Sequence, residues 1–307
     1  MSGLPDRVEN SLNENRMLLL GLQVLLGFGY RICFEAMFQR LPETARIAQV
    51  VGLGIMTAAL GWLIWPAAYH QLSEAGRTSA RIVVLATHIL DWALLPIGIA
   101  LGFSAYPLAA ALHLPHPKFI GLGFVVVALA IWYGPGLLRF EKKKRQEAIS
   151  KILQEEEGGH DDDISLRIKN VLIECRMALP GAQAFLGFQF AIVFSEGFQH
   201  LARSLQIAHF FSLLATTAAI VLLIAPAAYH RLVEAGRDSE HFHVVASRFL
   251  LTALVFLAPG MAGDLLIVLR TVIPSTAVAG AISVAFLLAF YSLWFGVSWL
   301  RKRAPEK

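Results

Sequence analysis

The sequence predicts an all-α membrane protein with eight transmembrane helices, arranged as two parallel four-helix repeats. First, 56% of its 307 residues are hydrophobic and 16% are charged, whereas a soluble domain carries about 25% charged residues. Second, apolar windows of about 20 residues recur, which is the length that a helix needs to cross a bilayer. Third, much of the sequence of the first half recurs in the second half. We expect the spans at roughly 17–38, 47–69, 82–103, 118–138, 177–198, 207–229, 243–269 and 277–300.

The repeat is clearest in "PAAYHQLSEAGR", which starts at Pro66, and "PAAYHRLVEAGR", which starts at Pro226. When each residue is aligned with the one 160 positions later, no gap is needed from Glu14 to Arg77, and half of the positions are identical. This predicts a first membrane repeat over 1–139, a cytoplasmic helical linker over 140–175 and a second repeat over 176–307. Each repeat has an even number of spans, so both insert in the same orientation and are related by an axis along the membrane normal.

The "R…GxQ…LLGF" pattern of the first helix and the "AP-x-AYHRL…GR" pattern that ends the second resemble an uncharacterised bacterial family of small four-helix membrane proteins, a domain of unknown function. Both halves carry the resemblance, so this chain would be a tandem, double-length member. The first copy departs from the pattern at Trp65 and Gln71, which replace Ala and Arg. The resemblance implies a fold and a membrane location, and no activity, cofactor or site residue comes with it.

Basic residues predict the orientation. Most of the 26 Lys and Arg lie in the two termini, the linker and two short loops, which the eight-helix arrangement places on one side. By the positive-inside rule, both termini are cytoplasmic, in a bacterial inner membrane. The run "EKKKR" at 141–145 then serves as a topology signal beside anionic lipid, and nucleic acid is excluded as a partner. Cys33 and Cys175 should lie at different depths, so no disulfide is expected.

The repeated motif has a structural interpretation. Its prolines kink the second helix of each repeat, its tyrosines lie at the interface, and each histidine can pair with the glutamate four residues later (His70 with Glu74, His230 with Glu234). A His/Glu proton relay or gate, or a metal site, are the alternatives. The motif residues at the cytoplasmic interface are Pro66, Tyr69, His70, Arg77, Pro226, Tyr229, His230 and Arg237.

Polar side chains inside the predicted spans are the second candidate site, because charge at membrane depth is expensive and usually functional or paired. In the first helix a polar stripe recurs every four residues, so that Arg31 and Glu35 can pair; its members are Gln23, Gly27, Arg31, Glu35 and Gln39. His88 and Asp91 lie three apart in the third helix, and Glu196 belongs to a different set in the second repeat. These charges predict either one asymmetric pathway between the repeats or contacts that hold helices together.

Two functions remain open from the sequence. The first is a transporter or channel for a small ion or solute, with Asp91 or Glu35 as the carrier and Arg31 as the counter-ion. The second is a non-transporting structural or accessory membrane protein. No motif indicates an enzyme, a cofactor or a metal site. The expected partners are the lipid bilayer and a small ion or solute. A homodimer is also allowed, although no surface for one can be identified.

Overall fold

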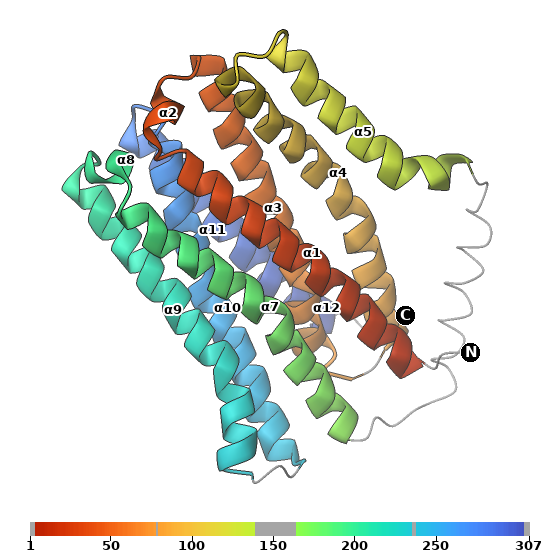
Figure 1. The fold of residues 1–307 in the computed structure, drawn as a ribbon. Helices are drawn as coiled ribbons and strands as arrows, with labels where there is room; N and C mark the ends of the chain where they lie inside the picture. Colours follow the sequence, from red (N-terminus) through yellow and green to blue (C-terminus); the bar gives the residue numbers. More distant parts are fainter. Residues whose placement is uncertain (1–3, 78, 139–163, 235–237, 304–307) are drawn as a thin grey trace.

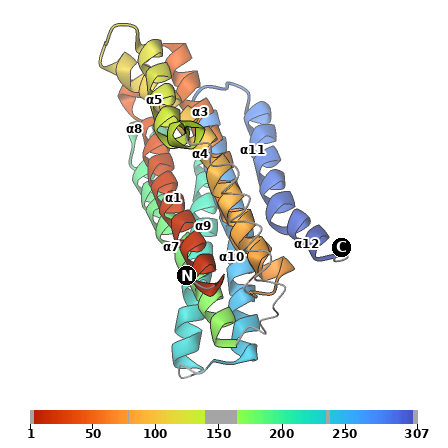
Figure 2. The same cartoon turned by 90° about the vertical axis from the view of Figure 1, so that its right-hand side faces the viewer.

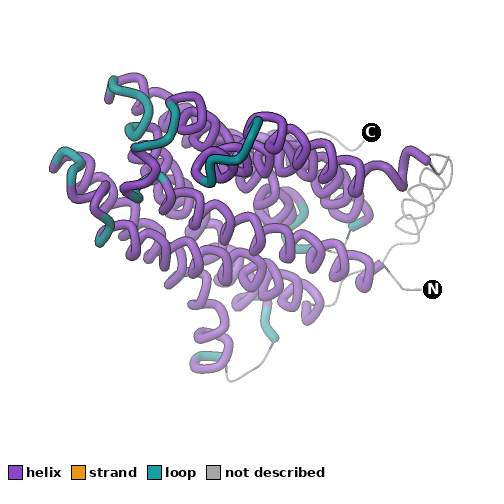
Figure 3. Tube along the Cα trace, turned by 45° about the horizontal axis from the view of Figure 1, so that its top comes forward, coloured by secondary structure: helices purple, strands orange, loops and turns teal. Residues whose placement is uncertain are grey.

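The computed structural model describes residues 4–77, 79–138, 164–234 and 238–303, and within these ranges the chain is helical with no strand. The predicted linker from 139 to 163 and Arg237 of the repeated motif lie outside the described residues. Short connections join long helices that run up and down the bundle (Figure 3). The helices of the first half are α1 (Leu4–Ile32), α2 (Ala36–Gln39), α3 (Glu43–Ser73), α4 (Ala80–Ala111) and α5 (Pro117–Leu138).

The second half repeats this order of elements. Its helices are α7 (Ile164–Val193), α8 (Glu196–Gln199), α9 (Arg203–Leu232), α10 (Glu240–Leu269) and α11 (Thr276–Tyr291), followed by a π-helical turn, η1 (Ser292–Val297), and α12 (Ser298–Arg303). The starts of α2, α3 and α4 recur in α8, α9 and α10 after 160 residues each. The predicted linker end, 164–175, is continuous with the following span, because α7 runs unbroken from Ile164.

Within the described residues, seven helices are long and apolar enough to cross a membrane, whereas eight spans were expected. The helix outside this set is α1. It begins in a polar stretch at Leu4 and ends at Ile32, so its apolar part from Met17 is shorter than the roughly 20 residues that a span requires. The span expected at 17–38 is therefore wrong at its end, since a turn at 33–35 and the short α2 replace its last two turns. The protein is a multi-helix membrane protein, and its eighth span is not confirmed.

The two halves meet along α1 and α7, which lie side by side at the centre of the bundle, with α3 and α10 also in contact (Figure 1). α5 lies on the outside against α4. The C-terminal segment from α11 to α12 forms an edge of the bundle in Figure 2 and packs against α3 of the first half. Trp294 in the π-helical turn donates its indole N–H to the carbonyl of Gly61 at 2.7 Å, and Phe290 lies against the same glycine.

Glycine permits the close approach of α1 and α7. A Cβ at Gly27 would lie 1.9 Å from the Phe188 ring, whereas a Cβ at its repeat counterpart Gly187 would meet nothing within 4 Å. We expect Gly27→Ala to lower the free energy of unfolding by about 1–3 kcal/mol, because the packed ring must shift. Gly187→Ala should be neutral or stabilising, since alanine is the better helix former. Thermal unfolding of both variants in detergent tests this, and equal effects would contradict it.

Candidate functional site

Buried ionisable groups gather where α3 ends. The helix stops after Ser73, and the chain reverses at Gly76, whose φ of +75° is the left-handed conformation that glycine adopts without strain. The amide of Gly76 donates to the carbonyl of His70 at 3.1 Å. Glycine in this conformation is a common way to end a helix. Here it turns the carbonyl of Arg77 back toward the His70 ring.

His70 pairs across the two repeats, not with Glu74 as its spacing suggests. Its Nδ1 lies 2.5 Å from Oε1 of Glu174 on α7, and both side chains are fully buried. Gln71 donates from Nε2 to the other oxygen of Glu174, also at 2.5 Å. Glu74 lies past the helix end, where its carboxylate accepts a hydrogen bond from the Ser79 hydroxyl. The expected intrahelical pair is therefore wrong.

The hydrogen bonds of His70 fix the position of a proton. Its Nε2 lies 2.8 Å from the carbonyl oxygen of Arg77, and a carbonyl can only accept, so Nε2 carries hydrogen. One further proton must then lie between Nδ1 and Glu174, either on the imidazole or on the carboxyl. The group thus holds a single proton that two atoms share, in a site closed to solvent.

Residues of α7 and α10 hydrogen-bond to the end of α3 and to the turn after it. Ser247 of α10 donates to Oε1 of Gln71 at 2.7 Å. Arg167 at the start of α7 donates to the carbonyl of Ala75 at 3.0 Å and binds the carboxylate of Glu240 at 3.0 Å. His243 is buried beside Gly76, with its Nε2 near the Cβ position of that glycine. The repeated motif of the first copy is therefore a contact between the halves.

A second group with the same chemistry lies near the opposite ends of α7, α9 and α10. Asp264 is fully buried, and its Oδ1 lies 3.0 Å from Nδ1 of His209. Gln189 donates from Nε2 to Oδ2 of Asp264 at 2.7 Å. Nε2 of His209 lies 3.0 Å from the carbonyl oxygen of Gln189, so this histidine also donates to a backbone carbonyl and shares one proton with a carboxylate.

We call these the Glu174 group (His70, Gln71, Glu174) and the Asp264 group (Gln189, His209, Asp264). Along α7, residues 174 and 189 are separated by about 22 Å at 1.5 Å per residue. Two buried polar features lie between these levels. Gln23 of α1 reaches the Cα of Gly181, and the Tyr30 hydroxyl hydrogen-bonds the Thr57 hydroxyl at 2.8 Å. Polar side chains thus recur along α7, between the repeats at the Glu174 group and at Gln23, and inside the second repeat at the Asp264 group.

The polar residues predicted as a pathway lie elsewhere. Arg31 ends α1, Glu35 lies beyond it, and their pair at 3.2 Å leaves each side chain 49% exposed. The expected four-residue stripe is wrong past Arg31, because the helix stops at Ile32. His88 is exposed and Asp91 is half-buried on α4. Of the predicted set only Gln23 is buried against the other repeat, and Glu196 is exposed beside His200.

The second copy of the motif has a different environment. His230 lies 3.3 Å from Oδ1 of Asp238, a pair with side chains 24% and 35% exposed, and not beside Glu234. The Tyr229 ring stacks on Phe242. Glu14, the counterpart of Glu174, is exposed. The same motif is therefore buried across the interface in one copy and faces outward in the other.

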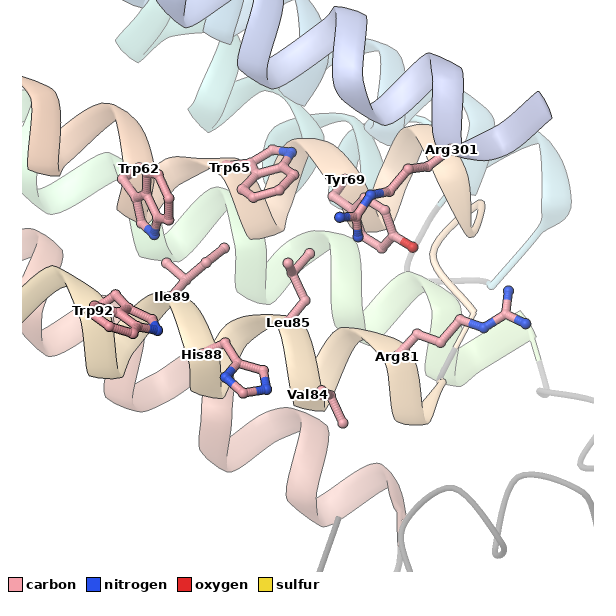
Figure 4. Close-up of a pocket in the computed structure, with 10 residues that line it drawn as sticks. All are labelled: Trp62, Trp65, Tyr69, Arg81, Val84, Leu85, His88, Ile89, Trp92 and Arg301. Carbon is pink, nitrogen blue, oxygen red and sulfur yellow. The ribbon is translucent and has the colours of Figure 1, made fainter. Parts of the chain in front are cut away.

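An open groove lies between α3, α4 and α12, with a volume of about 420 Å³ (Figure 4). Trp62, Trp65 and Tyr69 line it from α3, in successive edge-to-face contacts. Arg301 of α12 places its guanidinium carbon 5.6 Å from the Trp65 ring centre and 5.7 Å from that of Tyr69. Residues of α4 form the other wall: Arg81, Val84, Leu85, His88, Ile89 and Trp92.

Both cysteines are free and buried, as the depth argument predicts. Sequence reasoning did not single out His209, Asp264 or Glu174 as site residues, and it noted Gln71 only as a departure from the family pattern. A carboxylate within the apolar stretch of α10 is the signal that marks Asp264. The described residues contain no group of three or more His, Cys, Asp or Glu side chains placed to hold a metal.

No curated protein and no solved structure matches the chain. The profile of one family, described as a family of unknown function (DUF6328), matches twice, over residues 6–135 and again over 161–298. The two matches cover most of the chain and fall on its two halves, as a tandem duplication requires. The chain therefore belongs to this family of unknown function, as a member that carries the family unit twice.

Proposed function

We propose that the protein moves protons or a small cation across the membrane along the interface between its two repeats. The observation that carries the proposal is a pair of chemically equivalent groups at two levels of α7, one that spans the interface and one inside the second repeat. In each, a buried carboxylate shares one proton with a histidine and accepts a hydrogen bond from a glutamine amide. Ionisable groups buried at membrane depth commonly mark ion or proton pathways.

Each group is suited to binding and releasing a proton. In either protonation state the carboxylate keeps its glutamine donor and the histidine keeps its backbone acceptor, so the state can change without loss of those contacts. Gln23 and the Tyr30–Thr57 pair lie between the groups. Transfer between the two levels requires water to enter between the repeats, because about 22 Å exceeds the reach of side chains.

The test is proton flux into liposomes that contain a pH-sensitive dye, under proton, sodium and potassium gradients in turn. Glu174→Gln removes the titratable group but keeps its hydrogen bonds, since the new amide donates to Nδ1 of His70 and its carbonyl accepts from Gln71. Asp264→Asn does the same in the other group. We expect both to lose the flux of the wild type, and Glu14→Gln, at the exposed counterpart, to retain it.

Flux that survives in both folded variants would overturn this pathway. Asp91→Asn belongs in the same experiment, because the role of Asp91 or Glu35 as carrier, with Arg31 as counter-ion, is still a prediction. Loss of flux in that variant alone would move the pathway to α4.

A structural or accessory protein is the second candidate. It is favoured because both oxygens of Glu174 and both ring nitrogens of His70 are already hydrogen-bonded. Such a saturated pair can simply hold the repeats together. Absence of flux under every gradient, with loss of stability in the variants, would support this function over transport.

The proposal also covers the class of protein, the membrane in which it lies and its orientation there. A non-enzymatic protein in a bacterial inner membrane, with both termini cytoplasmic, agrees with the distribution of basic residues. Two repeats of four spans each, related by an axis along the membrane normal, would follow if α1 also crosses the bilayer. The lipid bilayer and a small ion are its proposed partners, and a homodimer stays a prediction.

A further inference from the structure

We propose that the groove between α3, α4 and α12 binds the headgroup of an anionic phospholipid. This inference is independent of transport. The groove combines an open cavity of about 420 Å³ with two arginines and a wall of aromatic rings. It lies at the end of the bundle that holds the α3–α4 turn and the C-terminal helix (Figure 4).

The arginines that line the groove favour an anionic ligand. Arg301 and Arg81 line the groove from α12 and from the first turn of α4, and the Trp65 and Tyr69 rings below Arg301 hold its guanidinium in place. Arginine suits phosphate because its planar guanidinium presents two N–H donors side by side. Glu74 lies at the same end, but its one carboxylate faces two arginines, Arg301 and Arg81, so the charge near Tyr69 is positive. Basic pockets between transmembrane helices are typical sites for anionic headgroups.

The aromatic wall selects a lipid over a soluble phosphate ester. Trp62 and Trp92 are 42% and 64% exposed on helices that are candidate membrane spans. They lie along the groove away from the arginines (Figure 4), where acyl chains would run if the phosphate binds at Arg81 and Arg301. Tryptophan is favoured at this boundary because its ring is apolar and its N–H is polar.

α12 completes the site. Its Ser298 accepts a hydrogen bond from the Trp65 indole at 3.3 Å, and its backbone carbonyl accepts one from the Ser73 hydroxyl at 2.7 Å. The π-helical turn before it seats Trp294 on Gly61, and π-turns of this kind are frequent at functional sites. The repeat counterparts of Trp62 and Trp65 are Leu222 and Ala225, so the aromatic wall exists in the first copy alone.

The test uses mixed micelles of purified protein with phosphatidylglycerol brominated on its acyl chains. Bromine quenches tryptophan fluorescence at contact, so a lipid in the groove should quench Trp62, Trp65 and Trp92. Brominated phosphatidylcholine is the neutral comparison, and glycerol 3-phosphate is added as a competitor. We expect tighter binding of phosphatidylglycerol, and no competition at concentrations comparable with the lipid.

Variants identify the site. Arg301→Gln and Arg81→Gln should each weaken binding of phosphatidylglycerol about fivefold, the contribution of one basic residue at a membrane surface. Arg301→Lys keeps the charge but loses the paired donors and the ring contacts, so it should bind more tightly than Arg301→Gln and less tightly than the wild type. Arg248→Gln removes an exposed arginine from α10, outside the groove, and should have no effect.

Two results would overturn the proposal. One is equal binding of phosphatidylglycerol and phosphatidylcholine. The other is an equal loss of phosphatidylglycerol binding in Arg248→Gln and Arg301→Gln, because the lipid would then be attracted by the basic surface as a whole and not by the groove. Displacement by glycerol 3-phosphate at such concentrations would also overturn it, in favour of a site for soluble phosphate esters.

Discussion

Replacing Glu174 with alanine is expected to lower the free energy of unfolding by about 3–5 kcal/mol, the range observed when one partner of a buried ion pair is removed. The side chain is fully buried and binds both His70 and Gln71. Alanine leaves the imidazole and the amide with donors that no water can reach. The loss should appear as a lower unfolding midpoint in detergent.

The repeat supplies the control. Glu14 occupies the equivalent position in the first copy but is exposed, so Glu14→Ala should leave the midpoint unchanged. The double variant His70→Leu/Glu174→Leu should recover much of the stability, because apolar side chains of similar volume can replace a buried pair. A Glu174→Ala protein as stable as the wild type would show that the pair contributes nothing to the contact between repeats.

The helices could be predicted from the sequence because their signal is local. Apolar windows locate α3, α4 and α5 in the first half and α7, α9, α10 and α11 in the second. The first span was wrong at its end. α1 stops at Ile32, although the apolar pattern continues to Phe34 and Phe38. Both phenylalanines are buried beyond the helix end.

The partners of the buried charges could not be predicted, because they depend on how the repeats pack. His70 and Glu74 have the spacing of a helical pair, yet the helix ends before Glu74 and α7 supplies Glu174 from 104 residues away. The five-residue motif itself does not distinguish His70 from His230, because it is identical in both copies. Their environments differ because Glu174 faces α3 whereas its counterpart Glu14 faces outward.

The same limit applies to the groove. Trp65 and Gln71 stood out only as departures from the repeat. Trp65 forms the aromatic wall under Arg301, and Gln71 binds Glu174. Both positions at which the first copy departs from the family pattern therefore lie at contacts that the second copy lacks. Comparing the repeats position by position identifies such residues, and the structure is needed to say what they contact.

Replacing Asp264 with alanine is expected to cost about 3–5 kcal/mol by the same reasoning, since it removes the shared partner of Gln189 and His209. Asp264→Asn should cost much less. The new amide can donate to Nδ1 of His209 while its carbonyl accepts from Gln189, so only the charge is lost. Glu196→Ala is the control at the same end of the bundle, because that carboxylate is 73% exposed.

A double-mutant cycle with His209→Ala isolates the pair. We expect a coupling energy within about 0.5–3 kcal/mol, the range found for residues in direct contact. If Asp264→Asn is as damaging as Asp264→Ala while the coupling stays large, the pair is held by charge, with the proton on His209. If asparagine is tolerated, hydrogen bonding is sufficient. That outcome makes the flux measurement on Asp264→Asn decisive, because a folded protein without the titratable carboxyl then separates proton transfer from structural support.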